Sequence, residues 1–393
     1  MGLTYQNPDG NRYVPGKSSL PEITPIDIPL EGKPIWLVGL PDGTRRYWAV
    51  VLVDGTVQGF QFSGERYTPS HIEPDKLPPG APPVLILNDG EPQILALPPD
   101  QYSSLTHPVR LYRSDSIVAI GVNGDLILLD ERLQEIDRLA VDALPDARLL
   151  IGESDRILLL TNPSIEYDHG VLGDALEATR VKLLSVSPGL SLIQEIALPP
   201  GRVIEGTAPI WTDLDGDGKR EIILTVSDAS QGAQIVVYDE TGSLLASGPP
   251  TGGAYRWRHQ IAVAPFGPQQ EVELVEVLTP HLGGIVGFFQ LDGKALKPVG
   301  QSTGCTSHVL GSRNLDMAAA ADFDGDGSVE LLLPAQDFGG LCAVRRTASG
   351  AQVFWTVASG GTISTNLGTI IDPNGEITIG VGLAESRLRI WVP

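Results

Sequence analysis

Two nine-residue segments of the chain, 213–221 and 322–330, share one pattern of acids and glycines. Each carries carboxylates at its first, third, fifth and ninth positions and glycines at its fourth and sixth. Closely spaced oxygens suit a hard cation such as Ca²⁺, which takes about six to eight of them. The seventh residue, Lys219 or Ser328, offers its backbone carbonyl, and the glycines let the loop curl without Cβ clashes. The pattern predicts two cation sites, with calcium as the expected ion and magnesium as the alternative.

The flanking residues decide which kind of calcium loop these segments form. An EF-hand needs a bidentate Glu at position 12 and a helix on either side, but the twelfth residues here are Leu224 and Leu333. Short apolar runs such as 222–226 and 331–333 adjoin the segments, and such runs are typical of buried strands. The flanks therefore favour a loop between β-strands over an EF-hand.

The whole unit of strand, Asp-x-Asp-Gly-Asp-Gly-x-x-Glu loop and strand resembles the FG-GAP (VCBS-type) repeat of integrin-α-like β-propellers. The resemblance covers two units of the chain in full. It implies that each loop joins the two innermost strands of a propeller blade and binds a cation through its four carboxylates. The ligands implied are Asp213, Asp215, Asp217 and Glu221 in the first loop and Asp322, Asp324, Asp326 and Glu330 in the second.

The rest of the chain has the pattern of an all-β protein. It contains 45 Gly and 32 Pro, and Asp-Gly and Asn-Gly turns recur between apolar runs, as they do in hairpins. Acids that align with the ninth loop position recur at Glu221, Glu273, Glu330 and Glu376, which are 52, 57 and 46 residues apart. A period of this length with four short strands per unit is typical of a β-propeller.

Weaker strand pairs in the N-terminal half bring the number of units to seven or eight. We expect a single propeller of about seven four-stranded blades, with eight as the alternative because the second unit is short. The last repeat has three strands before Pro393, whereas a blade needs four. We therefore expect residues 1–33 to form an N-terminal segment that closes the ring with an outer strand, best placed at 22–30, and residues 34–393 to form the propeller.

Charge and hydropathy limit the partners. The chain has 27 Lys and Arg against 48 Asp and Glu, a net charge of −21, which opposes nucleic acid and anionic membranes because both are bound mainly through Lys and Arg. No run approaches the roughly 18 apolar residues of a membrane span. Residues 1–33 lack the charged start and apolar centre of a signal peptide. We expect a monomer.

The compartment is inferred from the expected metal. Extracellular calcium modules bind at roughly 10⁻⁴ to 10⁻³ M, so such sites would stay empty in the cytosol. The loops therefore predict a location outside the cell, at the cell surface or in the periplasm. The two cysteines, Cys305 and Cys342, fall around one blade, and the sequence leaves open whether they form a disulfide or remain buried thiols.

No catalytic motif is evident in the sequence. The six histidines lack metal-ligand spacing, and there is no G-x-S-x-G elbow, phosphate loop or dinucleotide fingerprint. Binding of a protein or glycan without catalysis is the favoured function. An enzyme that processes extracellular polysaccharide, such as a lyase, is the alternative.

A ligand surface is expected on the face of the ring opposite the cation loops. Several loops on that face carry the aromatic and arginine side chains that contribute most to protein interfaces, and an insertion at 162–178 lies there too. For each single residue, packing between blades is the alternative role. The residues predicted for this face are Tyr255, Trp257, Arg258, His259, His281, Asp337 and Phe338.

Overall fold

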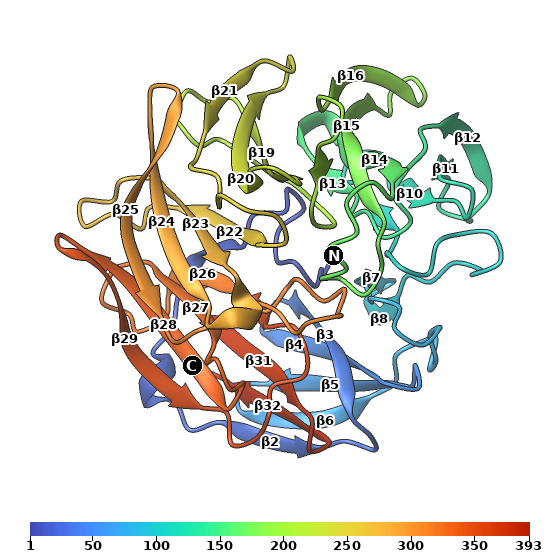
Figure 1. Ribbon diagram of the computed structural model, residues 1–393. Coiled ribbons are helices and arrows are strands. Elements are labelled where there is room, and N and C mark those ends of the chain that lie inside the picture. The colour runs from blue at the N-terminus through green and yellow to red at the C-terminus, as the bar shows by residue number, and fades with distance from the viewer.

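The chain folds into a β-propeller, and the computed structural model describes all residues from Met1 to Pro393. Eight sheet units follow one another along the chain around a common centre (Figure 1). Seven of them have four strands and the second has two. The expected all-β ring of about seven four-stranded blades is therefore confirmed, and the short second unit adds a two-stranded eighth.

The blades are numbered along the chain. Blade 1 contains β3 (Pro34–Asp42), β4 (Arg45–Leu52), β5 (Val57–Ser63) and β6 (Arg66–Ser70). Blade 2 contains β7 (Leu85–Asn88) and β8 (Glu91–Ile94). Blade 3 contains β9 (Val109–Arg110), β10 (Ile117–Ile120), β11 (Asp125–Leu129) and β12 (Glu135–Ala140). Blade 4 contains β13 (Leu150–Ile151), β14 (Ile157–Ser164), β15 (Glu177–Ser185) and β16 (Ser191–Ala197).

The second half of the chain supplies the other four blades. Blade 5 contains β18 (Ile210–Thr212), β19 (Glu221–Asp228), β20 (Gly232–Asp239) and β21 (Leu244–Ser247), and the short β17 (Val203–Ile204) links it to blade 4. Blade 6 contains β22 (Arg258–Ala264), β23 (Glu273–Leu278), β24 (Ile285–Asp292) and β25 (Ala295–Thr303). Blade 7 contains β26 (Ala319–Asp322), β27 (Glu330–Pro334), β28 (Gly340–Thr347) and β29 (Gly350–Ala358). Blade 8 contains β30 (Gly368–Ile371), β31 (Ile377–Leu383), β32 (Arg387–Trp391) and β2 (Ile26–Pro29).

The apolar core lies between neighbouring blades. Strands near the ring centre are buried on both faces, so β27 and β31 are buried at every residue and read as continuous apolar runs. The outermost strand β29 instead alternates between more and less exposed positions, as expected where one face meets solvent. Separate apolar clusters fill the gaps between adjacent blades, for example Leu332 with Ile379 and Trp48 with Ile390.

The N-terminal strand closes the ring as expected. Strand β2 pairs antiparallel with β32, with Ile28 opposite Leu388, and so forms the outer strand of blade 8. Ile28 is buried in the cluster between blades 8 and 1. The last blade is therefore built from both ends of the chain.

Residues 2–13 fill the centre of the ring, a role that the sequence analysis does not anticipate. The N-terminus lies near the centre in Figure 1, and β1 (Tyr13–Lys17) continues from there in parallel with β26. This central segment bonds to most blades in turn. Hydrogen bonds join Gly2 to Leu85, Pro8 to Ile151, Asp9 to Trp211, Asn11 to Val263, Arg12 to Ala320 and Gln6 to Leu367.

The remaining features are small. Three 3₁₀ turns occur, η1 (Leu20–Glu22), η2 (Glu153–Asp155) and η3 (Pro280–Leu282). A search for helices long and apolar enough to span a bilayer finds none. Cys305, which follows β25, is disulfide-bonded to Cys342 in β28, with Cα atoms 6.5 Å apart.

Ring closure by β2 makes a testable prediction. Replacing Ile28 with Ala leaves a cavity between blades 8 and 1 and should lower the free energy of unfolding by about 2–5 kcal/mol. Ile193→Ala is the matched control, because Ile193 is 48% exposed on β16 and its loss should cost less than about 0.5 kcal/mol. Denaturant unfolding measures both. Equal stability of the two variants would contradict the closing role of β2.

Candidate functional site

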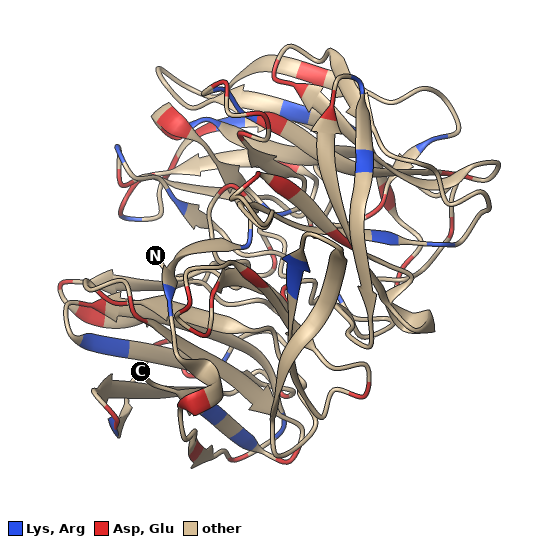
Figure 2. Ribbon diagram, turned by 90° about the vertical axis from the view of Figure 1, so that its left-hand side faces the viewer, with Lys and Arg blue, Asp and Glu red and all other residues tan.

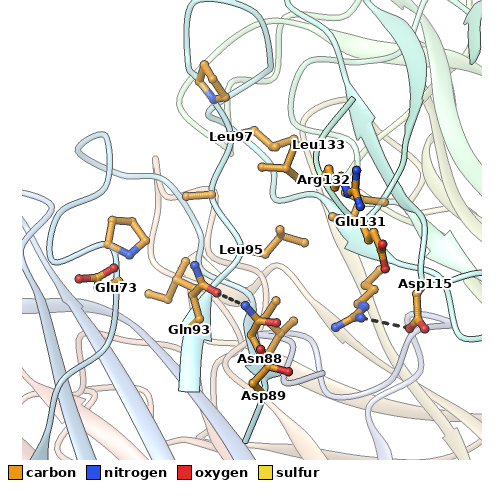
Figure 3. A pocket seen from close by; sticks show the side chains of 17 residues that line it. Glu73, Asn88, Asp89, Gln93, Leu95, Leu97, Asp115, Glu131, Arg132 and Leu133 are labelled. Carbon is orange, nitrogen blue, oxygen red and sulfur yellow. Dashed lines mark hydrogen bonds and ion pairs between the residues drawn. The ribbon is translucent and has the colours of Figure 1, made fainter. Parts of the chain in front are cut away.

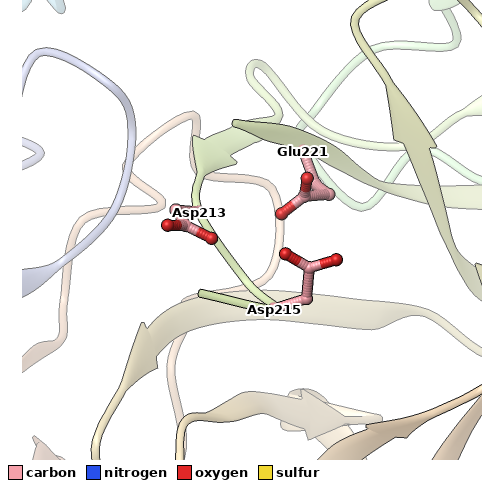
Figure 4. A group of neighbouring side chains, drawn as sticks. All are labelled: Asp213, Asp215 and Glu221. Atoms are coloured by element: carbon pink, nitrogen blue, oxygen red, sulfur yellow. The ribbon is translucent and has the colours of Figure 1, made fainter. Parts of the chain in front are cut away.

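The two acidic loops lie where the family resemblance predicts. The first joins β18 to β19 in blade 5 and the second joins β26 to β27 in blade 7, so each connects the two innermost strands of its blade. In each loop three of the four expected carboxylates converge, with one oxygen from each within 4.8 Å of the others. These groups are Asp213, Asp215 and Glu221, shown in Figure 4, and Asp322, Asp324 and Glu330.

The loops share one backbone conformation. The first acid accepts hydrogen bonds from two glycine N–H groups, at 2.7 and 3.0 Å from Asp213 and at the same two distances from Asp322. In the first loop those glycines, Gly216 and Gly218, have φ of +78° and +84°, which only glycine adopts readily. This conformation turns the carboxylates toward a common point.

The ninth residue of each loop is a buried acid. Leu214 N–H donates to Glu221 at 2.7 Å, and Phe323 N–H donates to Glu330 at 2.9 Å. Burial, reinforced by the carboxylates of Asp215 and Asp213, raises the pKa of Glu221 to about 7. Burial also raises the pKa of Glu330 to about 7, although Arg345 acts in the opposite direction. Protons therefore compete with a cation at both positions near neutral pH.

The acid at the fifth loop position, Asp217 or Asp326, lies outside the three-carboxylate group of its loop. The Asp217 carboxylate accepts a hydrogen bond from Lys219 N–H at 2.8 Å and pairs with Lys219 Nζ at 3.1 Å. The Asp326 carboxylate accepts from Ser328 N–H at 2.9 Å. Ligation by Asp217 and Asp326, and by the carbonyls of Lys219 and Ser328, remains a prediction.

The second loop has a basic partner that is remote in sequence. The nine residues of this loop include no Lys or Arg, whereas the first loop includes Lys219 and Arg220. In the structure, Arg345 of β28 lies against it, with guanidinium nitrogens 2.7 Å from Asp326 and 2.8 Å from Asp324. The same guanidinium pairs with Glu330, to which its Nε donates at 2.8 Å.

Aromatic and histidine rings cluster on the opposite face, where the loops between second and third strands meet the connections between blades. Trp257 stacks on His259 with ring centroids 4.8 Å apart and lies edge-on to His308 at 5.1 Å. Tyr255 stacks on Tyr167 at 5.3 Å. The structure thus brings together Tyr255, Trp257, His259 and His281 of the predicted face with Tyr167, His169 and His308.

The predicted ligand-face residues differ in accessibility. Trp257 and His259 are buried and form the floor of the cluster. Arg258 is also buried and pairs with Glu276 of the same blade, so its guanidinium does not reach the surface. Tyr255 and Asp337 are exposed, whereas His281 and Phe338 are half-buried. Asp337 and Phe338 lie in the β27–β28 loop, and Phe338 packs against the core between blades 7 and 8.

Five exposed apolar side chains lie on the segments that form this cluster. They come from the β14–β15 loop, the segment before β22, η3 and the loop before β26, and contacts link these segments to one another. The Gly311 N–H donates to the Val171 carbonyl at 2.9 Å. Nε2 of His281 lies 2.7 Å from Nδ1 of His308. We call the five side chains the apolar loop patch: Ile165, Tyr255, Leu282, Val309 and Leu310.

Sequence reasoning missed several members of both sites. Four of the missed residues lie in loops that come together only when the ring has formed: Leu282, His308, Val309 and Leu310. In the sequence they are marked only by their place in a loop between the second and third strands of a blade or between two blades. Arg345 carries no sequence signal that links it to the loop, because it lies on β28, the second strand after it. On the side shown in Figure 2, Lys and Arg positions are scattered among Asp and Glu positions.

The ring centre offers little space for a ligand. Because residues 2–13 fill it, the hollow lined by Arg12, Arg148, Trp257 and His259 measures about 20 Å³. That volume is close to the space needed by one water molecule, about 10–15 Å³. The polysaccharide-processing alternative therefore gains no support from the centre of the ring.

A wide groove lies between blades 2 and 3, with a volume of about 790 Å³. It exists because blade 2 lacks third and fourth strands beside β8. Leu95, Leu97 and Leu133 line its apolar part (Figure 3). Its polar groups pair with one another, Asn88 with Gln93 and Arg110 with Asp115, and do not converge on one point. None of its lining residues was predicted as a site.

Comparisons with known proteins give distant structural similarity. Neither a protein-family model nor a curated protein sequence matches the chain. The Dos1 propeller matches with a TM-score of 0.46 and 11% identity over 95% of this chain and 97% of its own. BamB from Moraxella catarrhalis matches with 0.45 and 13% over 94% and 99%, and the Cps50 (Swd1) β-propeller domain from Myceliophteria thermophila with 0.47 and 12% over 95% and 99%. At these values the similarity carries no inference about function.

The histidine pair beneath the patch makes the protein sensitive to acid. His308 Nε2 donates to the Ser312 carbonyl at 2.6 Å, so Nδ1 accepts from His281. Burial lowers the pKa of His308 to about 4, from 6.5. Between these pH values the unfolded chain binds the additional proton, so stability falls as the pH drops from 6.5 to 4, by roughly 3 kcal/mol for this residue.

We therefore expect His308→Gln to make the dependence of unfolding free energy on pH between 6.5 and 4 less steep. Part of the slope should remain, because burial also lowers the pKa of His107, to about 3. Chemical denaturation at several pH values measures the slope. The control is His71→Gln. His71 is exposed in the segment between blades 1 and 2, so its loss should leave the slope unchanged. A wild-type slope in His308→Gln would show that the pair does not titrate in this range.

Proposed function

We propose that the protein is a calcium-stabilised, FG-GAP-like propeller that acts outside the cell and binds a protein partner through the apolar loop patch. The observation that carries this proposal is the patch itself. Leu282 is 81% exposed, Ile165 74% and Leu310 65%, and they project from loops that contact one another. Exposed apolar patches on soluble proteins mark binding surfaces, and five exposed apolar side chains on neighbouring loops support such a surface here.

The structure beneath the patch supports a preformed binding surface. Trp257 packs with Val171, Leu172 and Leu315 in a small apolar cluster of its own, separate from the cores between blades. Stacked rings hold the loops in place from below, so the patch needs little ordering when a partner binds, which lowers the cost of association. Tyr255 is the only aromatic ring in the patch, and this composition favours a protein over a glycan.

Calcium is proposed from the chemistry of the first loop. Asp213, Asp215 and Glu221 bring oxygens together without a basic side chain among their partners. Two unit charges at 4 Å repel by about 4 kcal/mol at an effective dielectric constant near 20, so a divalent cation would relieve the loop. The placement of both loops between innermost strands supports the FG-GAP assignment, and the disulfide is compatible with an oxidising location.

The calcium proposal is tested by thermal unfolding after chelation. Calcium at about 100 times its dissociation constant should stabilise the protein by about 2.7 kcal/mol, which raises the Tm by about 3 °C for a chain of this size. Asp215→Asn should remove this rise. Asp100→Asn, at an exposed acid remote from the loops, should keep it. A full calcium-dependent rise in Asp215→Asn would refute ligation by the first loop.

The binding face is tested with two charge-inserting double variants. Leu282→Asp with Leu310→Asp places charge within the patch and should weaken binding of a captured partner at least about tenfold, because apolar anchors contribute most of the binding energy. Leu192→Asp with Leu244→Asp is the control, since both leucines are exposed on the outer strands β16 and β21. Crosslinking to surface proteins followed by mass spectrometry measures capture. Equal capture by both variants would exclude the patch.

A further inference from the structure

We infer that the guanidinium of Arg345 is the resident cation of the second acidic loop, so that the protein binds one calcium ion, at the first loop. The inference rests on the proposed function in that it assumes calcium at Asp213, Asp215 and Glu221. It differs from the expectation of two equivalent sites. It assigns the two loops, which share a sequence pattern and a backbone conformation, to two different sources of positive charge.

Arg345 contacts the oxygens that a metal ion would need. It lies 2.8 Å from Asp324 and 2.7 Å from Asp326, and it pairs with Glu330. The side chain is largely buried, and strand β29 holds it in place. The ring of Phe354 lies with its centroid 3.9 Å from the guanidinium carbon, and Trp355 Nε1 donates to Asp324 at 3.1 Å.

The strand register explains why only one loop has this partner. In blade 7 the ninth loop residue, Glu330, lies directly opposite Arg345 on the next strand. In blade 5 the corresponding residue, Glu221, lies opposite Asp239. The same position therefore supplies a cation to the second loop, whereas in blade 5 it holds an acid whose carboxylate accepts hydrogen bonds from Thr241 and Ser243 in the following turn. Nearby basic residues do not pair with Asp213, Asp215 or Glu221. Lys219 pairs with Asp217, and Arg220 pairs with Glu153 and Asp9 outside the loop.

The other two aligned acids follow the pattern of the second loop. Glu273 in blade 6 accepts a hydrogen bond from Arg346 Nε at 2.9 Å. Glu376 before β31 lies 3.5 Å from Lys17 Nζ. Three of the four aligned acids thus meet a cationic side chain, and Glu221 is the one that does not. A calcium ion at Glu221 would complete the series, whereas calcium at Glu330 would have to displace a guanidinium that three carboxylates hold.

Calorimetric titration of the chelator-treated full chain with CaCl₂ tests the inference through the number of ions bound. Wild type should bind one ion. Asp215→Asn should bind none, Asp324→Asn should still bind one, and Arg345→Met should bind two. Arg346→Met is the matched control, because Arg346 is the next residue on the same strand but faces Glu273, and it should still bind one.

Each outcome has a distinct meaning. Two ions in wild type with one lost in Asp324→Asn would overturn the inference, and so would one ion in a folded Arg345→Met. No ion in wild type would instead refute the calcium part of the proposed function. If Arg345→Met fails to fold, terbium luminescence decides with the folded chain. Trp355 contacts Asp324, so Trp355→Phe should leave the emission of bound terbium unchanged, and a loss of emission would place the ion in the second loop.

Discussion

The carboxylate of Asp316 lies at the centre of the ring, where it accepts hydrogen bonds from Thr4 Oγ1 at 2.7 Å, Arg12 at 3.2 Å and Arg148 at 3.1 Å. All four residues are buried. Thr4 and Arg12 belong to the central segment, Arg148 precedes blade 4 and Asp316 precedes blade 7. Removing one partner of a buried ion pair costs about 3–5 kcal/mol, so this network ties opposite sides of the ring together through the N-terminal residues.

This arrangement closes the ring twice and limits where function can lie. Strand β2 closes it at the outer edge of blade 8, and the central segment closes it from within by bonding to the inner parts of the blades. Since the segment fills the centre, the ring has no channel through which a substrate could pass. Binding is left to the two faces and the outer grooves, and the apolar loop patch lies over a base of buried, packed rings.

Features that a few neighbouring residues determine can be predicted from the sequence. Features that depend on contacts between residues far apart in the chain cannot. The acidic loops, their β flanks, the short second unit and the closing strand each follow from a few consecutive residues or from the repeat period. Residues 2–13 show no strand alternation, and their partners lie far along the chain, as with Thr4 and Asp316 at a separation of 312 residues. The pairing of Arg345 with Glu330 needs the register of two strands, and the contact of His308 with the stacked rings of Trp257 and His259 needs two segments that are remote in sequence.

The acid at the ninth position of the repeat has a structural role that does not depend on metal binding. Glu221, Glu273 and Glu330 each begin the second strand of a blade and are buried there. A buried carboxylate is costly unless it is paired or protonated. An arginine from the next strand, an arginine from the adjacent blade or a bound cation can each supply that pairing with little change in the backbone. The two matching loop conformations, one with Arg345 and one without, show that the backbone of the loop does not depend on the arginine, and for that reason a complete acidic motif does not by itself count metal ions.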